Sequence, residues 1–340
     1  MKKLFVVCIS VLLNATLFAN NLQKDPFITR TFPAASIKSV EVTTSGGSIT
    51  VAGDATKDAI VEVYVSRDKW SNEKIKETLE ENYTLDIKVE SGKLLVSAKS
   101  KKNISNWNLD GLNISFKIIV PKQVSSNLQT SGGSIHISKL TGAQDIKTSG
   151  GSLTIEDVSG NIKGKTSGGS INVSNANDNI ELSTSGGSIT AKDCNGKVSL
   201  KTSGGSLHLN NLNGDVIAST SGGSIKAKEV KGTLKAGTSG GSITLDDISG
   251  SVDAHTSGGS INVTMVSVSD YVKLSNSGNT NLTIPANNGY NLKIKGNKVE
   301  TSGLKDFRGN MDSKSLEGTM GNGGANIEIK TSHRASVKFK

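Results

Sequence analysis

The chain has 340 residues, of which 38 are glycine, 4% are aromatic and 2 are cysteine. Its formal net charge of +9 is scattered among acids without a run of five like charges or interleaved aromatic residues, which argues against a nucleic-acid-binding protein. Two cysteines exclude a disulfide-rich scaffold, so packing must hold the fold together.

The first nineteen residues are typical of a secretory signal peptide. Lys2 and Lys3 precede an apolar run over residues 4–13, and small residues lead up to Ala19. The run is too short for a good membrane span, so we expect cleavage after Ala19 and no membrane span in the mature chain. Cleavage would remove Cys8 and lower the net charge from +9 to +7 (9 − 2 = 7). The sequence therefore predicts an exported protein, located in the periplasm, at the cell surface or outside the cell.

Residues 20–129 have the composition of strands with one helix. The helix is expected over 72–83, with Ser71 or Asn72 as its N-cap. Its apolar residues share one stripe: Ile75, Leu79 and Tyr83. Strands are expected at 36–51 on either side of a corner, and at 59–66, 84–90, 93–99 and 112–120. We expect this region to be an elaborated first coil that caps the fold and hides its edge.

Both tryptophans, Trp70 and Trp107, lie in this region. Two interpretations stay open: each ring belongs to the core of the cap, or it is an exposed platform on which a sugar ring stacks. A pocket that joins Trp107 to acids such as Asp110 would support the second interpretation.

The central region, residues 130–275, is organised by one phrase that returns every eighteen residues. Thr-Ser-Gly-Gly-Ser, followed by Ile or Leu, begins at Thr130, and a separate copy occupies 44–49. The later copies begin at Thr148, Thr166, Thr184, Thr202, Thr220, Thr238 and Thr256. A fixed period indicates one structural unit stacked on itself.

Within each unit, counted from the Thr as position 1, apolar residues occupy positions 6, 8, 11, 15 and 17. The unit from Thr238 shows them as Ile243, Leu245, Ile248, Val252 and Ala254. Pairs spaced two apart indicate strands with one buried face, and no stripe has helical spacing. Position 13 is usually glycine, which supplies a turn. We expect two short strands per unit and tight corners between them.

This pattern predicts an all-β fold, a right-handed parallel β-helix (β-solenoid) of about eight regular eighteen-residue coils. The coils would form a column roughly 38 Å long. The doublets at 6 and 8 and at 15 and 17 fit poorly to the six-residue spacing of left-handed β-helices, and right-handed crossing is the general preference.

The Thr and Ser of the phrase are expected to form hydroxyl ladders at a glycine-rich corner. The simplest interpretation is that the corner chemistry repeats because the corner repeats. The alternative is a flat hydroxyl surface that orders water or binds glycans. An ice-binding face would instead want Thr-x-Thr on an outward strand, which the phrase lacks.

After Ser275 the period slips, and residues 276–340 are expected to form terminal coils and an irregular cap. Strands are expected at 284–285, 290–295, 325–330 and 335–340, and an irregular glycine-rich segment over 307–324.

No constellation of side chains indicates catalysis or metal binding. His136 and His208 share position 7 but stand four rungs, about 19 Å, apart, too far to share a metal. His255 and His333 stand alone, and acidic pairs such as 156–157 and 246–247 give way to Ser, Lys or Asn in other coils, as a solvated surface does. Cys194, at position 11, is expected to be a small buried side chain. We expect no enzyme, no cofactor, no catalytic residue and no metal site.

Several segments together resemble the bacterial putative-adhesin family of β-helical domains of unknown function. They are the opening coil at 36–51, the helix insert, the strand 116–121 before the first regular corner and the repeated Thr-Ser-Gly-Gly-Ser coils. The terminal motifs at 284–290, 307–309, 316–318 and 323–325 also match. The resemblance covers nearly all of the mature chain and implies an exported β-helix with a role at the cell envelope. It carries over no binding residue.

The sequence thus predicts an exported cell-envelope protein, an adhesin or a surface-binding scaffold without catalytic activity. Its partner would be a glycan or another cell-surface component. The first alternative is a glycan-active enzyme or lectin with its site in the N-terminal cap. The second is an ice- or surface-ordering protein, which an irregular outward face would argue against.

Overall fold

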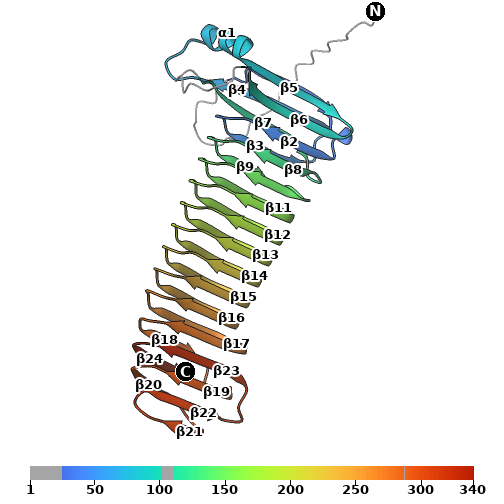
Figure 1. The fold of residues 1–340 in the computed structure, drawn as a ribbon. Coiled ribbons are helices and arrows are strands. Elements are labelled where there is room, and N and C mark those ends of the chain that lie inside the picture. The colour runs from blue at the N-terminus through green and yellow to red at the C-terminus, as the bar shows by residue number, and fades with distance from the viewer. Residues whose placement is uncertain (1–24, 102–110, 287) are drawn as a thin grey trace, which may run out of the picture.

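The computed structural model describes residues 25–101, 111–286 and 288–340. The signal peptide expected over residues 1–19 lies outside this part of the chain. The described residues form 24 strands, one α-helix and one short 3-10 helix, and the strands join into one sheet that winds into a rod (Figure 1). The predicted β-solenoid is confirmed.

The central column is a stack of long parallel strands. Its first coil contains β9 (Ile135–Ser138) and β10 (Gln144–Lys147). The following coils are β11 (Leu153–Lys165), β12 (Ile171–Ser183), β13 (Ile189–Lys201), β14 (Leu207–Ser219), β15 (Ile225–Thr238), β16 (Ile243–Thr256) and β17 (Ile261–Asn276). Equivalent residues stack directly, as Ile189 on Leu207 and Val198 on Val216 show.

The first regular coil has the two short strands that we expected, β9 and β10. From β11 to β17, each coil instead holds one continuous strand of 13 to 16 residues. From β11 to β16 the strand bends without losing its parallel pairing because two positions of each coil have left-handed backbone conformations. Position 10 has φ between 51° and 57° in Lys139, Asp157, Asn175, Asp193, Asn211, Glu229 and Asp247. Position 13 has positive φ as well and is glycine except at Asp178. Such residues redirect a strand as bulges do.

The interior of the column is filled by the five apolar ladders that the sequence predicts. In the coils that begin at Thr130 to Thr238, the residues at positions 6, 8, 11, 15 and 17 are buried, with Gln144 as the one polar member and Gly164 without a side chain. In the coil from Thr256 the register shifts, and Val266 and Asp270 at positions 11 and 15 are exposed. Each fully buried aliphatic side chain contributes about 1.5–3 kcal/mol. Because every coil contacts its two neighbours, these contributions repeat from rung to rung.

The first coil of the chain is not the first rung of the stack. Its strands β2 (Ser39–Thr43) and β3 (Ile49–Asp54) lie between two later coils. The outer neighbours are β6 (Lys93–Ser100) and β7 (Asn113–Pro121), and the inner ones are β8 (Ser125–Gln129) and β9. The chain therefore forms the coil of β2 and β3 first and the outer coil of β6 and β7 second. It then returns past β2 and β3 to form β8 and β9 on their inner side.

Antiparallel strands and a helix close this N-terminal end. β4 (Asp58–Ser66) pairs with β7, β1 (Ile28–Pro33) with β4, and β5 (Tyr83–Glu90) with β6. The helix expected over 72–83 is α1 (Asn72–Asn82), and the Ser71 hydroxyl accepts the N–H of Lys74 at 3.3 Å as its N-cap. The 3-10 helix η1 (Ala34–Ser36) leads from β1 towards β2.

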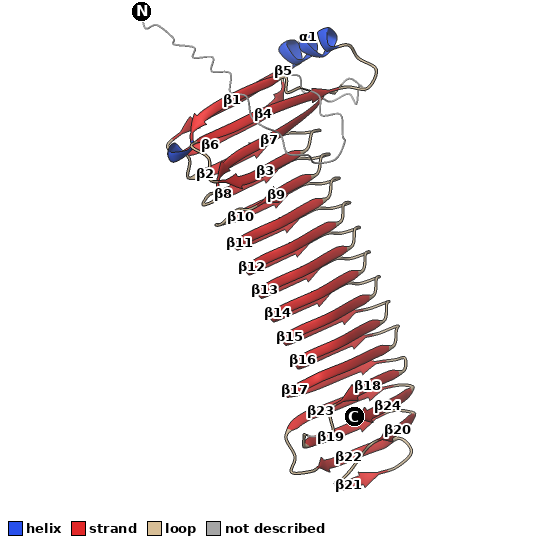
Figure 2. Cartoon of the chain, turned by 180° about the vertical axis from the view of Figure 1, so that it is seen from behind, coloured by secondary structure: helices blue, strands red, loops and turns tan. Residues whose placement is uncertain are grey.

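The C-terminal end also contains a coil that is inserted between two others (Figure 2). β23 (Ala325–Thr331) and β24 (Arg334–Phe339), the last strands of the chain, lie between two earlier coils. One neighbour is formed by β17 and β18 (Thr280–Ile284), the other by β19 (Tyr290–Lys295) and β20 (Lys298–Ser302). The segment 307–324 is not irregular as predicted, because β21 (Phe307–Met311) and β22 (Ser315–Met320) form an antiparallel hairpin on β19. In the part of the chain that is described, no helix combines the length and the apolar character needed to cross a membrane.

Candidate functional site

The repeated corner assigns a structural role to its first residue. The Thr at position 1 is buried in every regular coil. In a typical corner the Thr202 hydroxyl donates to the carbonyl of Gly187 at 2.7 Å and accepts the N–H of Gly205 at 3.3 Å. The Thr ladder thus faces inward and ties each corner to the one before it.

The two serines of the corner differ in their contacts. The hydroxyl of the Ser at position 5 accepts a backbone N–H from the next rung, as Ser188 does from Ser206 at 3.1 Å. The Ser at position 2, such as Ser185 or Ser203, is exposed. None of these position-2 hydroxyls in the column bonds to another described residue. The fold therefore uses the serine at position 5 and leaves the one at position 2 free.

The two glycines also differ. A Cβ on Gly187, at position 4, would stand 2.1 Å from the carbonyl oxygen of Gly169, which no L side chain tolerates. A Cβ on Gly186, at position 3, would stand 3.5 Å from its nearest atom, an ordinary contact. The stacking of corners therefore requires glycine at position 4, whereas at Gly186 there is room for a side chain at position 3.

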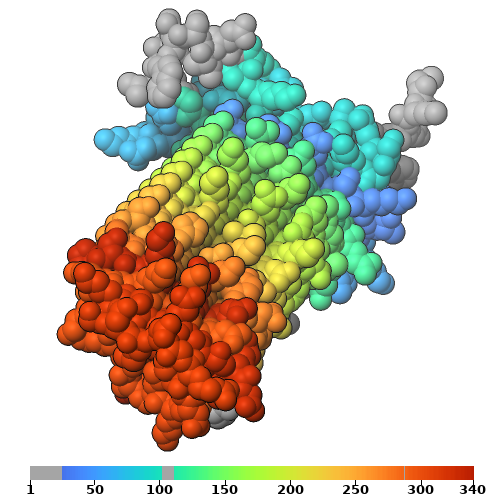
Figure 3. Space-filling view, turned by 60° about the horizontal axis from the view of Figure 1, so that its bottom comes forward, coloured from blue at the N-terminus to red at the C-terminus, as the bar shows by residue number. Residues whose placement is uncertain are grey.

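The broad faces of the column carry no repeated chemistry. Position 7 points outward and reads His136, Thr154, Asn172, Thr190, His208, Lys226 and Thr244 along the stack. The space-filling view shows the side chains aligned in rows along the rod (Figure 3), but the residues in one row differ. This irregular outward face argues against the ice-ordering alternative.

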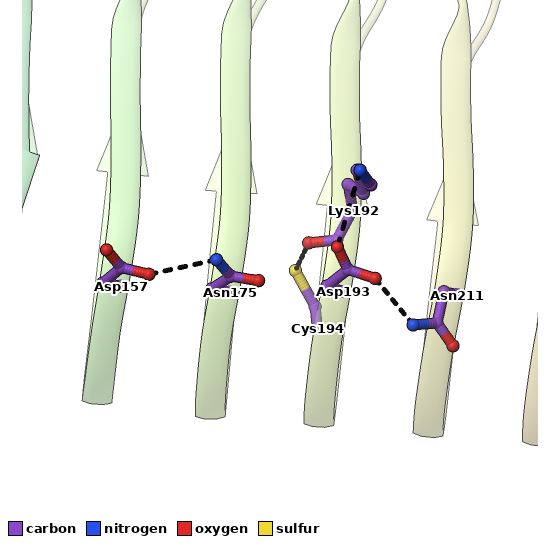
Figure 4. A network of polar contacts seen from close by, with 6 residues as sticks. All are labelled: Asp157, Asn175, Lys192, Asp193, Cys194 and Asn211. Carbon is purple, nitrogen blue, oxygen red and sulfur yellow. Dashed lines mark hydrogen bonds and ion pairs between the residues drawn. The ribbon is translucent and has the colours of Figure 1, made fainter.

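Asparagine and aspartate line the edge where the strands bend (Figure 4). Asn175 donates to Asp157 at 3.0 Å, and Asn211 donates to Asp193 at 2.6 Å. Position 10 was expected to vary freely, yet five of its seven residues are Asn or Asp, the side chains that best tolerate a left-handed backbone. The ladder therefore has a structural explanation.

Cys194 is buried, as expected for position 11. Its thiol lies 3.3 Å from the carbonyl oxygen of Lys192 (Figure 4). Burial raises the pKa of the Cys194 thiol from its ordinary value near 9 to about 11. Because the thiolate is the reactive form, this side chain is poorly suited to act as a nucleophile at neutral pH.

The histidines remain apart. His136 and His208 point outward from β9 and β14, which are separated by three intervening strands. His255 lies in β16 and His333 in the turn between β23 and β24. Across residues 25–101, 111–286 and 288–340, no group of three or more His, Cys, Asp or Glu side chains could hold a metal ion.

A shallow groove of about 380 Å³ lies where the column begins, between β2 and β11. It contains Gln144, whose side chain is buried, accepts from the Ser126 hydroxyl at 2.5 Å and donates to the carbonyl of Val124 at 2.8 Å. The side chains of Gln144 and Ser126 therefore already have hydrogen-bond partners within the fold, and they do not need a ligand to satisfy them.

Trp70 belongs to the packing of the N-terminal end. Its ring is half-buried against the core, with the Lys74 ammonium 4.2 Å and the Arg67 guanidinium 5.4 Å from the ring centre. These two cations lie over the Trp70 ring in cation–π contacts, so the ring is not an open platform on which a sugar could stack. The interpretation of Trp70 as cap core is therefore favoured. Trp107 and Asp110 lie outside the described residues.

The N-terminal end gathers apolar side chains that the fold covers incompletely. Eight of the thirteen partly buried apolar residues packed against the core are located there: Phe27, Ile28, Phe32, Trp70, Tyr83, Leu85, Ile87 and Val89. Four of these and Leu79 line a groove of about 320 Å³, with Lys76 and Glu80 at its rim. Between residues 130 and 267 no apolar residue is of this partly buried kind, and the two exposed large ones, Ile217 and Val266, stand on separate coils. The N-terminal end is therefore the candidate contact surface.

No protein-family model matches the chain, and no curated protein matches it. Three solved structures resemble it: a putative cell adhesion protein from Clostridium sporogenes ATCC 15579 and putative adhesins from Bacteroides fragilis NCTC 9343 and Parabacteroides distasonis ATCC 8503. Their identities are 9%, 12% and 12%, and their TM-scores 0.21, 0.26 and 0.22. The matches cover 92%, 92% and 93% of this chain and 98%, 96% and 98% of the others.

Proposed function

We propose that the chain is an exported, non-catalytic binding protein of the bacterial cell envelope, an adhesin whose N-terminal end makes the contact. The column would then be a stiff spacer that holds this end at a fixed distance from its attachment. The leader-like first nineteen residues support export. The regular column supports the role of a spacer, since each strand from β11 to β16 pairs with the next in the same eighteen-residue register.

The observation that carries this proposal is the uneven distribution of incompletely covered apolar surface. In the column the inward side chains are buried, and the outward ones are mostly polar, with Ile217 and Val266 as exposed large apolar side chains on two separate coils. At the N-terminal end, Leu85, Ile87 and Val89 remain half-buried beside the groove under α1. Apolar surface gathered at one place and rimmed by polar groups marks an interaction site.

A non-catalytic role is supported by the geometry of the column. Every corner-to-corner interval from Thr130 to Thr256 is eighteen residues, so no loop is long enough to shape a pocket. The hydroxyls of Thr at position 1 and Ser at position 5 are engaged in backbone hydrogen bonds, and Cys194 is buried. These are properties of a scaffold.

The groove at the N-terminal end suits an amphipathic partner. Tyr83 and Leu79 offer apolar surface, and Lys76 and Glu80 offer one charge of each sign at the rim. A glycan presents an apolar ring face together with hydroxyl groups, so it fits this combination of side chains. Another component of the cell surface with both kinds of group would fit as well.

The test is binding of the purified mature chain to an array of glycans and isolated envelope components. The first variant exchanges charges at the groove, Lys76→Glu with Glu80→Lys, and keeps the net charge. The matched control exchanges charges on the column, Lys226→Asp with Asp246→Lys, beside a shallow groove there. We expect the groove variant to lose at least about tenfold in affinity and the column variant to bind as the parent does. Equal loss in both variants, or binding to nothing, would contradict the proposal.

A further inference from the structure

The strand β5 presents a free edge at the N-terminal end. It pairs with β6 alone, through a two-residue turn in which Ser91 and Gly92 have φ of 50° and 79°. A turn of this kind makes Glu90 and Lys93 the hydrogen-bonded pair next to it. By alternation, the N–H and C=O groups of Leu85, Ile87 and Val89 point away from β6. None of them bonds to another described residue.

The other terminal strands with one neighbour are protected. On β1, Arg30 stands opposite the buried Val61 and so places a charge over the core, and Pro33 ends the strand. On β20, the N–H of Val299 bonds to Ser313 in a covering turn. β21 is five residues long with Gly309 at its centre. Inward charges, proline, short length and covering turns are the usual means of blocking edge pairing, and within residues 25–101, 111–286 and 288–340 the structure shows none of them at β5.

The side chains of β5 are complementary to those of a second β5 in antiparallel orientation. Its inward residues are apolar, and Asp86, Lys88 and Glu90 alternate in sign on the outward face. Lys88 lies 3.5 Å from Asp86 and 2.9 Å from Glu90, all three more than 40% exposed at their side chains. These exposed ion pairs contribute little within one molecule and are free to be exchanged.

Charge and length of overlap together select one register for such a pair, since a pair centred on Leu85 or Val89 would align only about five or three residues of β5 with its copy. If Ile87 lies opposite its own copy, Leu85 meets Val89 of the second copy and Asp86 meets Lys88 of the second copy, twice by symmetry. The same register brings the free N–H and C=O groups of Ile87 against each other. A shift that centres the pair on Asp86 or on Lys88 would place like charges directly opposite, which is destabilising.

We propose that β5 is a self-recognition edge through which two copies of the chain pair head to head, in antiparallel orientation with Ile87 at the two-fold axis. The partner is a second copy of this chain. The pair would cover Leu85, Ile87 and Val89 of both molecules and continue one sheet from rod to rod. β1 ends the other face of the rod, because it continues β4, β7 and β3, whereas β5 continues β6 and β2, so β1 takes no part in this pairing.

This pairing gives the proposed adhesin function a partner, and rests on that function for its biological meaning. Seven residues per strand pair in this register, from Thr84 to Glu90, so the interface is at the small end of specific protein contacts. A single contact of this size is weak. Many copies arrayed on two facing surfaces would hold firmly through multivalency.

The test is the oligomeric state of the mature chain and of two charge variants, measured by sedimentation velocity from micromolar to millimolar concentration. We expect the parent chain to dimerise reversibly. Asp86→Lys and Lys88→Asp place like charges opposite at the two symmetric positions, so each variant alone should dimerise at least about tenfold more weakly. Mixed in equal amounts, the two variants regain opposite charges and should form a heterodimer.

The double variant, Asp86→Lys with Lys88→Asp, should dimerise as the parent does, because it only exchanges the two charges. A parent that stays monomeric over the whole range, or single variants that dimerise like the parent, would overturn the proposal. The groove variant Lys76→Glu with Glu80→Lys leaves β5 intact and should dimerise normally. Loss of ligand binding in that variant with normal dimerisation, or the reverse in the β5 variants, separates the failure of one proposal from the failure of the other.

Discussion

The column and the N-terminal end are built from the same kind of coil, but they differ in how the edge of each coil is covered. In the column each rung is covered by the next, and one corner repeated eight times supplies turn, ladder and core. At the N-terminal end there is no next rung. The chain closes it with the antiparallel strands β1, β4 and β5, a capped helix and a coil inserted out of order.

The difference teaches where selection for function can act. In the column, Thr at position 1 and Gly at position 4 are fixed by contacts with neighbouring corners, so little can change without loss of the stack. At the end, Leu85, Ile87 and Val89 are half-buried and the edge of β5 is unpaired. The uniform part of the molecule sets its length, and the irregular part is available for contact.

The strongest way to break the column is at a glycine of position 4. Gly187→Ala would drive a Cβ to 2.1 Å from the carbonyl of Gly169, so the stack must open. We expect a loss of at least about 3 kcal/mol in the free energy of unfolding, or failure to fold. The matched control is Gly186→Ala, where the nearest atom is 3.5 Å away and the loss should stay below about 1 kcal/mol. Equal losses in chemical denaturation would contradict the stacked corner.

A smaller effect is expected from the buried hydroxyl ladder. Thr202→Val keeps the shape of the side chain but leaves the carbonyl of Gly187 and the N–H of Gly205 without the hydroxyl. The expected loss is about 1–3 kcal/mol. Ser203→Ala, at the neighbouring exposed position, should change stability by less than about 0.5 kcal/mol. Thermal and urea unfolding of the two variants measure the contrast, and a larger loss for Ser203→Ala would refute the assignment of the ladders.

The smallest predicted effect is a gain. Asp178 has φ of 83° at position 13, where the coils before and after it have glycine. Asp178→Gly should remove this backbone strain and raise the free energy of unfolding by about 1 kcal/mol. Gly196→Asp, the reverse change in the next coil, should lower it, because a Cβ there would stand 2.3 Å from the carbonyl of Asp178. If both variants lost stability equally, position 13 would not be the strained site that the φ values indicate.

The column could be predicted from the sequence because each of its positions sees the same surroundings in every coil. The apolar positions 6, 8, 11, 15 and 17 are enough to derive the winding and the core. The left-handed bend at position 10 was missed, although a signal was present: Asn or Asp occurs there in five of seven coils. Acidic residues at positions 9 and 10 draw attention as pairs, and the pattern is visible only when position 10 is compared alone from coil to coil. Lys139 and Glu229, which are neither Asn nor Asp, also make the preference at position 10 less evident.

The ends could be predicted only in part, because their order is set by packing between distant segments. The sequence indicated the helix over 72–83 and the neighbouring strands at 84–90 and 93–99, all of which are local. Nothing in residues 36–51 or 325–340 tells that these coils are inserted between others. Gly309 and Gly318 made 307–324 look irregular, whereas the two glycines face each other across the β21–β22 hairpin. The free edge of β5 follows from the same long-range order and has no signature of its own.

The most direct test of the stacked column is the removal of one whole coil. Deletion of residues 184–201 joins Ser183 to Thr202 and leaves every corner on its eighteen-residue period. We predict a folded rod with the same circular dichroism per residue, cooperative thermal unfolding and a length reduced by about 4.8 Å. Deletion of the half coil 184–192 moves the period out of register and should abolish folding. If the half-coil deletion melted like the whole-coil deletion, equivalent residues would not be stacked one above another, and the account of the column would be wrong.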